Sequence, residues 1–323
     1  MGEEVSSGVA VGVDIGGTKL AAGLVGADGS VLDRVRHATP ADDLQELTDR
    51  IVSVIEDLRS RHHVGDVPVG IGIAGLVDRS GVVRYAPNLP LRDHPIGKEV
   101  GSRLWGPVTV ENDANAAAWG EYRAGAGRDA QDSLVMLTLG TGVGGGLVLE
   151  DRLVRGATGM AGELGHIAVL EGGPLCPCGA RGCLEAMSSG TALARNAREA
   201  IADGRIRAGT ALAELDPAEI DGKAVTVAAF AGDAEAVRIL ATAGRWLGVG
   251  IASLIAAFDP EIVVLGGGAM QAGALLLEPA RQAAAERLLG RGYRDLPPIV
   301  HAGLADDAGL VGAALLAMAS ATD

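Results

Sequence analysis

All three cysteines of this 323-residue chain lie in one short segment, "CPCGARGC". They are Cys176, Cys178 and Cys183, and His166 precedes them. Three thiolates and one imidazole form the donor set of a closed tetrahedral zinc site, which leaves no open position for catalysis. Buried unreactive thiols or a redox switch are the alternatives, although Cys176 and Cys178 are too close in the sequence for an easy disulfide. The segment therefore predicts a structural zinc ion.

A second group of polar side chains stands between an apolar segment and an alanine-rich one. The sequence "ENDAN" supplies Glu111, Asn112, Asp113 and Asn115. One such side chain is expected to cap a helix N-terminus, but four exceed what a single helix requires. A carboxylate at this junction could take a proton from a substrate hydroxyl. The chemistry would then be hydroxyl activation with in-line phosphoryl transfer, with its charge neutralised by Mg²⁺.

Three glycine-rich loops each follow an apolar segment: "DIGGTK", "LGTGVGGG" (139–146) and "LGGGAM" (265–270). Small residues let a phosphate approach the backbone N–H groups of a turn. Thr18 and Lys19 would add a hydroxyl and a cation, and Asp14 could hold Mg²⁺ through water. A simple hairpin turn explains any one loop equally well. Three loops in equivalent positions favour phosphate binding.

Apolar periodicity and turn residues predict the elements that position these groups. We expect strands at 9–15, 19–26, 31–37, 69–75, 107–110 and 261–268, and a hairpin around 78–81. We expect helices at 42–61, from about 115, and at 190–203, 232–257, 270–288 and 306–320. From residue 133 the early order of strand, glycine loop, strand, acidic turn and strand starts again. This repeat predicts two related α/β domains that face each other.

Composition narrows the classes of partner. The formal net charge of −14 disfavours nucleic acid, because such a surface repels phosphodiesters. The N-terminal residues lack the pattern of a secretory signal, and the longest apolar run, 246–258, is shorter than a membrane span and predicts a buried helix. We therefore expect a cytoplasmic protein with reduced cysteines and no membrane partner. Aromatic residues make up only 2% of the chain, so a polar ligand would be recognised mainly by hydrogen bonds.

Taken together, "DIGGTK", "ENDANAA", "LGTGVGGG", "GELGH" and "CPCGARGCLE" give the chain a family resemblance. It resembles the ROK family (repressors, open reading frames and kinases), and within it the bacterial ATP-dependent glucokinases. The resemblance implies an α/β fold of the actin-like ATPase (ribonuclease H-like) class, with a cleft between two related α/β domains. The expected domains are a small one of 1–117 plus 307–323 and a large one of 118–306 that carries the zinc-binding segment.

The resemblance also implies roles for individual residues, with Asp113 as the general base on the sugar 6-hydroxyl. The expected sugar-binding residues are Gly75, Asn88, Asn112, Asp113, Glu163, His166 and Glu185. Those expected around ATP and Mg²⁺ are Asp14, Gly16, Gly17, Thr18, Lys19, Gly140, Thr141, Gly142, Gly267 and Gly268. The implied zinc ligands are His166, Cys176, Cys178 and Cys183, with His166 contacting sugar through one ring nitrogen and zinc through the other.

The activity implied is transfer of a phosphoryl group from Mg-ATP to the 6-hydroxyl of glucose. Another hexose is an alternative substrate, namely fructose, mannose, N-acetylmannosamine or N-acetylglucosamine. A non-catalytic sugar-sensing regulator is the alternative from a different class. Relatives are commonly dimers or tetramers, so we expect a homodimer or homotetramer.

Overall fold

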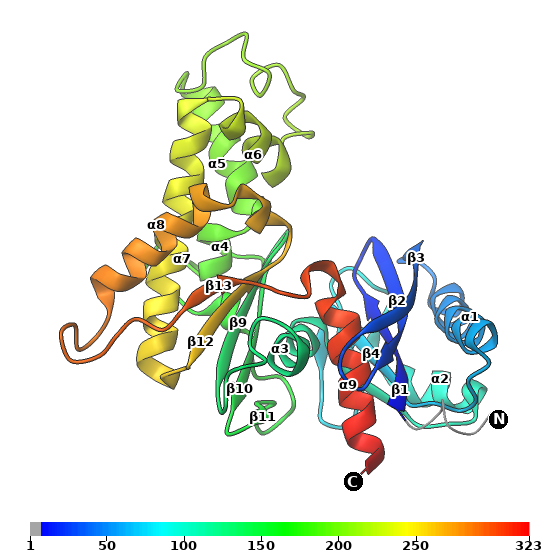
Figure 1. Ribbon diagram of the computed structural model, residues 1–323. Helices are drawn as coiled ribbons and strands as arrows, with labels where there is room; N and C mark the ends of the chain where they lie inside the picture. The colour runs from blue at the N-terminus through cyan, green and yellow to red at the C-terminus, as the bar shows by residue number, and fades with distance from the viewer. Residues whose placement is uncertain (1–7, 323) are drawn as a thin grey trace. The chain divides into compact units, whose positions relative to one another are not determined.

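The computed structural model describes residues 8–322 (Figure 1). By their internal contacts the residues form two compact units. Unit 1 comprises Met1–Met136, Gly146–Gly162 and Ala302–Asp323, and unit 2 comprises Leu137–Gly145 and Glu163–His301. The domain bounds expected from the sequence, 1–117 plus 307–323 and 118–306, stay a prediction.

Strands and helices alternate along the chain. The strands are β1 (Val9–Ile15), β2 (Lys19–Gly26), β3 (Val31–Ala38), β4 (Val69–Ile73), β5 (Leu76–Val77), β6 (Val83–Tyr85), β7 (Arg92–His94), β8 (Val108–Asn112), β9 (Leu134–Leu139), β10 (Val143–Leu149), β11 (Arg152–Leu153), β12 (Ile262–Gly266) and β13 (Ile299–His301). The α-helices are α1 (Leu44–His62), α2 (Ile96–Leu104), α3 (Asp113–Ala124), α4 (Leu184–Ser188), α5 (Gly190–Ala202), α6 (Gly222–Phe230), α7 (Ala234–Phe258), α8 (Ala274–Arg287) and α9 (Ala308–Thr322). Short 3₁₀ helices are η2 (Leu164–His166), η3 (Gly268–Ala272) and η4 (Ala305–Asp307).

Two five-stranded sheets share one strand order. The first runs β3-β2-β1-β4-β8 and the second β11-β10-β9-β12-β13. In the first sheet β2 pairs antiparallel with β1 and β3, whereas β4 pairs parallel with β1 and β8. In the second, β10 and β11 are antiparallel and β12 and β13 are parallel. The repeated layout expected from residue 133 onward is confirmed.

The first sheet is covered by a helix whose bounds follow from its sequence. Helix α1 begins after Asp43, whose side chain accepts a hydrogen bond from the Glu46 N–H, and ends at His63 in a left-handed conformation. Its apolar residues recur at helical spacing, and Leu47, Ile51, Ile55 and Leu58 are fully buried. They join one core with the apolar side chains of β1, β2 and β4. The helix predicted at 42–61 is therefore confirmed.

Glycine residues let helices α3 and α9 pack with their backbones in contact. A Cβ atom at Gly312 would lie 1.7 Å from the carbonyl oxygen of Ala116, and one at Gly120 would lie 2.6 Å from that of Ala308. No side chain larger than hydrogen fits at these two positions. Because α3 begins at Asp113, this contact also places the candidate base relative to α9.

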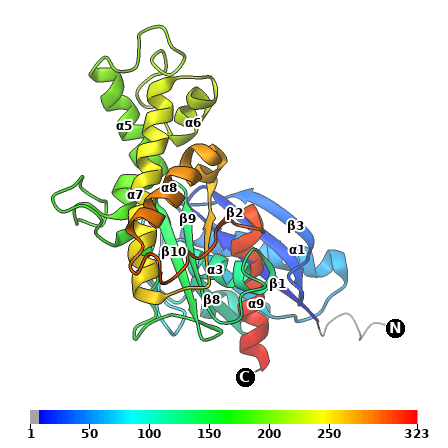
Figure 2. The same cartoon turned by 60° about the vertical axis from the view of Figure 1, so that its left-hand side comes forward.

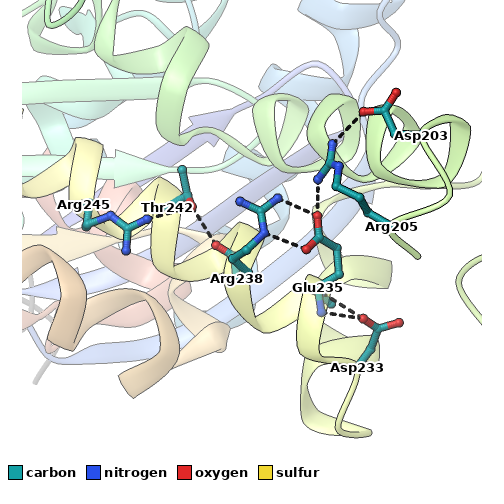
Figure 3. Close-up of polar contacts among 8 residues, drawn as sticks. Asp203, Arg205, Asp233, Glu235, Arg238, Thr242 and Arg245 are labelled. Atoms are coloured by element: carbon teal, nitrogen blue, oxygen red, sulfur yellow. Dashed lines mark hydrogen bonds and ion pairs between the residues drawn. The ribbon is translucent and has the colours of Figure 1, made fainter. Parts of the chain in front are cut away.

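Unit 2 carries a bundle of helices in which α5, α6 and α7 lie side by side (Figures 1 and 2). Figure 3 shows the polar network at the start of α7. The Asp233 carboxylate caps the helix, and Glu235 accepts hydrogen bonds from Arg238 and from Arg205, which follows α5. The Arg238 guanidinium lowers the pKa of Glu235. This network fastens the chain after α5 to the first turn of α7.

Some elements differ from expectation. The helix expected at about 270–288 is confirmed as α8, but it begins later, because Gly273 at φ 57° separates the 3₁₀ turn η3 from α8. The helix predicted at 306–320 begins with another 3₁₀ turn, η4. Helices α2 and α6 and strand β7 were not predicted. Glycine or β-branched residues weaken the local helix signal in α2, "IGKEVGSRL", and in α6, "GKAVTVAAF".

Helix α7 corrects the argument from the apolar run at 246–258. The run continues a longer helix, and this 25-residue helix is long and apolar enough to cross a membrane by length and composition. Within the described residues it is the one helix of this kind, and 61% of its most apolar window is buried. Burial therefore identifies α7 as a core helix, as predicted, whereas length alone does not.

Candidate active site and metal cluster

The turn between β1 and β2 is closed by its own backbone. The Gly16 N–H donates to the Lys19 carbonyl over 3.0 Å. Thr39 fixes the turn from outside, because its hydroxyl donates to the Gly16 carbonyl over 2.8 Å and its N–H donates to the Thr18 carbonyl over 3.1 Å. Thr18 and Lys19 are exposed. Residues 16–19 therefore form one turn, and the side chains of Thr18 and Lys19 are accessible.

Asn88, a predicted sugar-binding residue, lies against this turn. A Cβ atom at Gly17 would lie only 2.6 Å from the Asn88 Cβ, whereas one at Gly16 would have no atom closer than 3.6 Å. Glycine at position 17 is thus required by close approach. The structure brings the first glycine turn and Asn88 together.

Asp14 is the second-last residue of β1, beside the turn. A Cβ atom at Gly309, at the start of α9, would lie 2.7 Å from the Asp14 Cγ, so the carboxylate sits directly against that helix. Burial first, and then the negative charge of Asp113, raise the pKa of Asp14 to about 7, while Lys19 lowers it. A positive charge placed here would therefore stabilise the ionised carboxylate.

Asp113 is the first residue of α3. Its Oδ1 accepts the Ala114 N–H over 2.9 Å, and the residue is half-buried. Burial raises the pKa of its carboxyl group. Among the described residues no lysine or arginine forms an ion pair with it. A carboxylate with a raised pKa is a stronger proton acceptor than an ordinary aspartate, which suits a general base.

Asn112 is the N-cap of α3. Its Oδ1 accepts the Asn115 N–H over 2.9 Å, and its Nδ2 donates to the Gly75 carbonyl over 3.0 Å. The capping interpretation therefore holds for this member of "ENDAN". The same contacts hold Asn112 next to Gly75, and both are predicted sugar-binding residues.

The turn between β9 and β10 in unit 2 is fastened to α5. The Gly140 N–H donates to the Gly142 carbonyl over 2.9 Å, and the Gly190 N–H donates to the Gly140 carbonyl over 2.8 Å. The Thr191 hydroxyl donates to the Thr141 carbonyl over 2.8 Å. The second predicted phosphate loop thus lies at the N-terminus of a thirteen-residue helix, where backbone N–H groups favour anions.

The third glycine loop adjoins the second. Gly267 has φ 88°, and a Cβ atom there would lie 2.4 Å from the Leu139 carbonyl oxygen at the end of β9. Gly267 and Gly268 are both exposed. These two loops therefore form a surface of bare backbone at one edge of the second sheet.

Glu185 links the second glycine turn to the cysteine segment. Its Oε2 accepts the Val143 N–H over 2.9 Å, and the Cys176 thiol donates to its Oε1 over 3.4 Å. A Cβ atom at Gly142 would lie 2.3 Å from the Glu185 Oε2. Any larger residue at position 142 would displace this carboxylate.

The donor atoms of His166, Cys176, Cys178 and Cys183 all lie within 4.8 Å of one another. The Sγ atoms of Cys178 and Cys183 are 3.7 Å apart, and the His166 Nδ1 is 3.5 Å from the Cys176 Sγ. In a tetrahedron with bonds of about 2.3 Å to sulfur and 2.0 to 2.1 Å to nitrogen, these separations would be about 3.8 and 3.5 Å. The donor set and its spacing fit a zinc ion.

Burial raises the pKa of the Cys176 and Cys183 thiols, whereas the N–H of Ala180 lowers the pKa of Cys178. The loop depends on Gly182 at φ 72°, where a Cβ atom would lie 1.7 Å from the Leu170 carbonyl oxygen. Two buried thiols with raised pKa values stay protonated unless a cation compensates them. A bound cation would lower both pKa values and stabilise the thiolates.

His166 presents its second ring nitrogen to Glu163. The His166 Nε2 lies 3.8 Å from the Glu163 Oε2, while its Nδ1 faces Cys176. The short helix that carries His166 packs tightly on β10, since a Cβ atom at Gly165 would lie 1.8 Å from the Val143 carbonyl oxygen. The two ring nitrogens therefore face different partners, and the two roles predicted for His166 stay a prediction.

The predicted residues thus gather in two sets. Unit 1 holds Asp14, Gly16, Gly17, Thr18, Lys19, Gly75, Asn88, Asn112 and Asp113. Unit 2 holds Gly140, Thr141, Gly142, Glu163, His166, Cys176, Cys178, Cys183, Glu185, Gly267 and Gly268.

Several supporting residues were not predicted. Thr39, Gly190 and Gly309 each contact a glycine turn or Asp14, and Arg155 binds Glu111. Gly190 stands beside a capping serine, which was a usable local signal for a helix start. The other three have no such signal, because their partners lie far away in the sequence.

Comparison with known proteins extends this picture. The ROK family model matches residues 10–320. The glucokinase of Streptomyces coelicolor is 43% identical over 313 residues, which cover 96% of this chain and 98% of that protein. The N-acetylmannosamine kinase of Escherichia coli O157:H7 is 35% identical over 320 residues, which cover 94% of this chain and 97% of that protein.

Among solved structures, a ROK family glucokinase from Streptomyces griseus in complex with glucose and AMPPNP superposes with a TM-score of 0.83 at 41% identity, covering 96% of this chain and 99% of that chain. The predicted α/β fold of the actin-like ATPase class is confirmed by this likeness and by the twin five-stranded sheets. A match over nearly the whole length, with its motifs in the expected places, shows that the chain belongs to the ROK family.

Proposed function

We propose that this chain is an ATP-dependent glucokinase that transfers the terminal phosphoryl group of ATP to the 6-hydroxyl of glucose. The observation that carries the proposal is Asp113, a half-buried carboxylate with a raised pKa and no cationic partner among the described residues. Such a group is suited to accept a hydroxyl proton near neutral pH. The similarity to the Streptomyces glucokinases supports glucose and ATP as the substrates.

In this proposal Asp113 receives the proton as the 6-oxygen attacks phosphorus, and ADP leaves with the bond electrons. Asn112, held by Gly75, and Asn88 bind sugar hydroxyls from unit 1. Glu163, His166 and Glu185 bind the remaining hydroxyls from unit 2. Polar side chains fixed by their own hydrogen bonds lose little conformational entropy when a sugar binds.

The glycine turns hold the nucleotide. Residues 16–19 and 140–142 surround the phosphates and bind them through backbone N–H groups other than those of Gly16 and Gly140, which close their own turns, and Lys19 adds a positive charge. Gly267 and Gly268 lie against the adenosine. When bound, Mg²⁺ would neutralise phosphate charge, and Asp14 would be the residue that holds it. The raised pKa of Asp14 fits this role, because a nearby cation would favour its ionised form.

His166, Cys176, Cys178 and Cys183 would hold a structural zinc ion. When bound, zinc would hold the segment together and anchor His166, which would leave the other face of the imidazole for the sugar. Anchoring a sugar-binding imidazole in this way sets both its tautomer and its orientation.

Another amino or neutral hexose is the second candidate substrate, because the similarity extends to N-acetylmannosamine kinase. The decisive experiment measures ADP release with ATP, Mg²⁺ and a panel of glucose, mannose, fructose, N-acetylmannosamine and N-acetylglucosamine. We expect the highest kcat/KM with glucose. A higher value with another sugar would transfer the proposal to that substrate, and sugar binding without ADP release would favour a non-catalytic sensor.

The oligomeric state and the cytoplasmic location remain predictions. Light scattering after size exclusion would distinguish the expected homodimer or homotetramer from a monomer.

A further inference from the structure

An ion pair between the buried carboxylate of Glu111 and the partly exposed guanidinium of Arg155 lies two residues before the proposed base. Glu111 belongs to β8 and is only 4% exposed. The Arg155 Nε donates to its Oε2 over 2.6 Å. A carboxylate so far removed from water is costly to ionise without a partner. Arg155 is therefore the charged partner of this buried carboxylate.

The other oxygen of Glu111 reaches the segment that carries the base. Its Oε1 accepts hydrogen bonds from the Asn112 N–H over 3.0 Å and from the Asn115 Nδ2–H over 3.1 Å. Asn112 in turn accepts the Asn115 N–H through its own Oδ1 over 2.9 Å. These hydrogen bonds enclose the first turn of α3, and Asp113 stands between the two asparagines in the sequence.

Asn115 depends on this carboxylate for its orientation. The residue is 1% exposed, and its Oδ1 is buried with no hydrogen-bond partner among residues 8–322. An unsatisfied buried polar atom is costly, and loss of the hydrogen bond to the amide nitrogen as well would add to that cost. Glu111 provides that bond, so loss of its charge would loosen Asn115 and the Asn112 N–H together.

We propose that Arg155 and Glu111 are a positioning pair for Asp113. Arg155 holds the Glu111 carboxylate, and Glu111 holds the first turn of α3 so that Asp113 meets the sugar hydroxyl in a productive orientation. Neither residue needs to touch the substrate. The inference rests on the proposed kinase function and assigns a role to two residues that lie outside the sugar, nucleotide and zinc sets.

The segment that carries Arg155 is held at a second point, which supplies a matched control. The Arg79 Nε donates to the Gly156 carbonyl over 2.7 Å, and the Arg79 N–H donates to the Thr158 carbonyl over 3.2 Å. Arg79, Arg155 and Glu111 line one surface cavity of about 440 Å³. Arg79 therefore anchors the same segment without bonding Glu111.

The experiment compares steady-state kinetics of the full chain with glucose and Mg-ATP. We expect Arg155→Met and Glu111→Gln each to lower kcat about tenfold or more, because small misplacement of a reacting group is costly, with the KM for glucose little changed. Arg155→Lys should recover part of the loss. The double variant should be faster than either single variant, because it leaves neither an unpaired buried carboxylate nor a guanidinium that faces a neutral amide. Arg79→Met should keep the wild-type kcat.

All rates are measured below the thermal unfolding transition of every variant. A purely structural pair would lower the unfolding temperature and leave the kcat of the folded protein unchanged, which would overturn the inference. Equal losses in Arg79→Met and Arg155→Met would also overturn it, since the segment and not Glu111 would then matter. If the wild-type chain does not phosphorylate glucose, the proposed function fails. If the wild-type chain is active and the variants keep its kcat, only the positioning role fails.

Discussion

The turns β1–β2 and β9–β10 occupy the same place in two sheets of the same strand order, yet they carry different side chains. The first is flanked by Asp14 and Lys19, a carboxylate and an ammonium group. The second lies between Leu139 and Val143 and offers backbone groups and the hydroxyl of Thr141. One topology thus presents an ionic turn in unit 1 and a neutral turn in unit 2.

The residues around the two turns differ in the same way: carboxyl groups lie near the first, and hydrogen bonds hold the second. Near the first, the carboxyl groups of Asp14 and Asp113 have raised pKa values because they are buried, and the charge of Asp113 adds to the shift of Asp14. The second is tied by backbone hydrogen bonds to α5 and by Glu185 to the cysteine segment. We infer that the proton acceptor lies in unit 1, whereas the second turn binds through backbone groups that α5 and Glu185 hold in place.

The largest effect is expected for the proposed base. Asp113→Asn removes the proton acceptor with almost no change in volume, so kcat should fall about 10²- to 10⁴-fold while glucose still binds. ADP release and calorimetric titration with glucose measure the two quantities. Asp129→Asn, at an exposed aspartate, is the matched control. Wild-type kcat in Asp113→Asn would remove this residue from the mechanism.

The next largest effect is expected for the cysteine segment in unit 2. Cys178→Ser should lower the zinc content and weaken glucose binding about 10- to 100-fold, because the metal no longer anchors His166. Leu175→Ser changes an exposed residue of the same segment and should alter neither value. Metal analysis and calorimetry provide the measurements. Wild-type protein that contains no zinc would contradict the prediction outright.

Two glycine-to-alanine substitutions test the neutral turn, and they differ in the room available to the added Cβ atom. Gly142→Ala places a Cβ atom 2.3 Å from the Glu185 Oε2, whereas Gly140→Ala meets nothing within 4 Å. We expect Gly142→Ala to lower kcat/KM for glucose about tenfold through displacement of Glu185, and Gly140→Ala to have little effect. Equal kinetics for the two variants would show that Glu185 is not held for function.

Two alanine substitutions in the ionic turn allow the same comparison. Gly17→Ala places a Cβ atom 2.6 Å from the Asn88 Cβ, whereas the nearest atom to a Cβ at position 16 is the Lys19 carbonyl oxygen at 3.6 Å. A severalfold loss of kcat/KM in the first variant and little change in the second is the expected result, measured by ADP release. If Gly16→Ala is the more damaging, the phosphate contact at residue 16 outweighs the packing of Asn88.

The smallest effect concerns pH. Because burial raises the pKa of Asp113 in the free protein, its carboxyl group holds a proton at pH values where an ordinary aspartate has lost it. The kcat/KM for glucose should therefore decline on acidification at a pH above the usual aspartate range, and recover as the pH rises. A profile that stays flat down to the ordinary aspartate pKa would show that Asp113 titrates normally.

Much of the fold could be predicted because its signals are local. Buried apolar runs, turn residues and capping side chains act between neighbours, so the strands of the first sheet and helix α1 lie close to where they were expected. The residue types of the candidate site were also local signals. The break at Gly273 was missed because a helix pattern continues across it, and only the backbone φ of 57° reveals the interruption.

The sequence by itself determined the family, the twin layout and the donor set of the metal cluster, since each depends on residue types in a fixed order. Only the tertiary structure decided that Arg155 binds Glu111, that Gly309 lies against Asp14, and that Glu185 joins the cysteine segment to a glycine turn. Such contacts join residues far apart in the chain. They depend on strand order and helix packing, which no local pattern encodes.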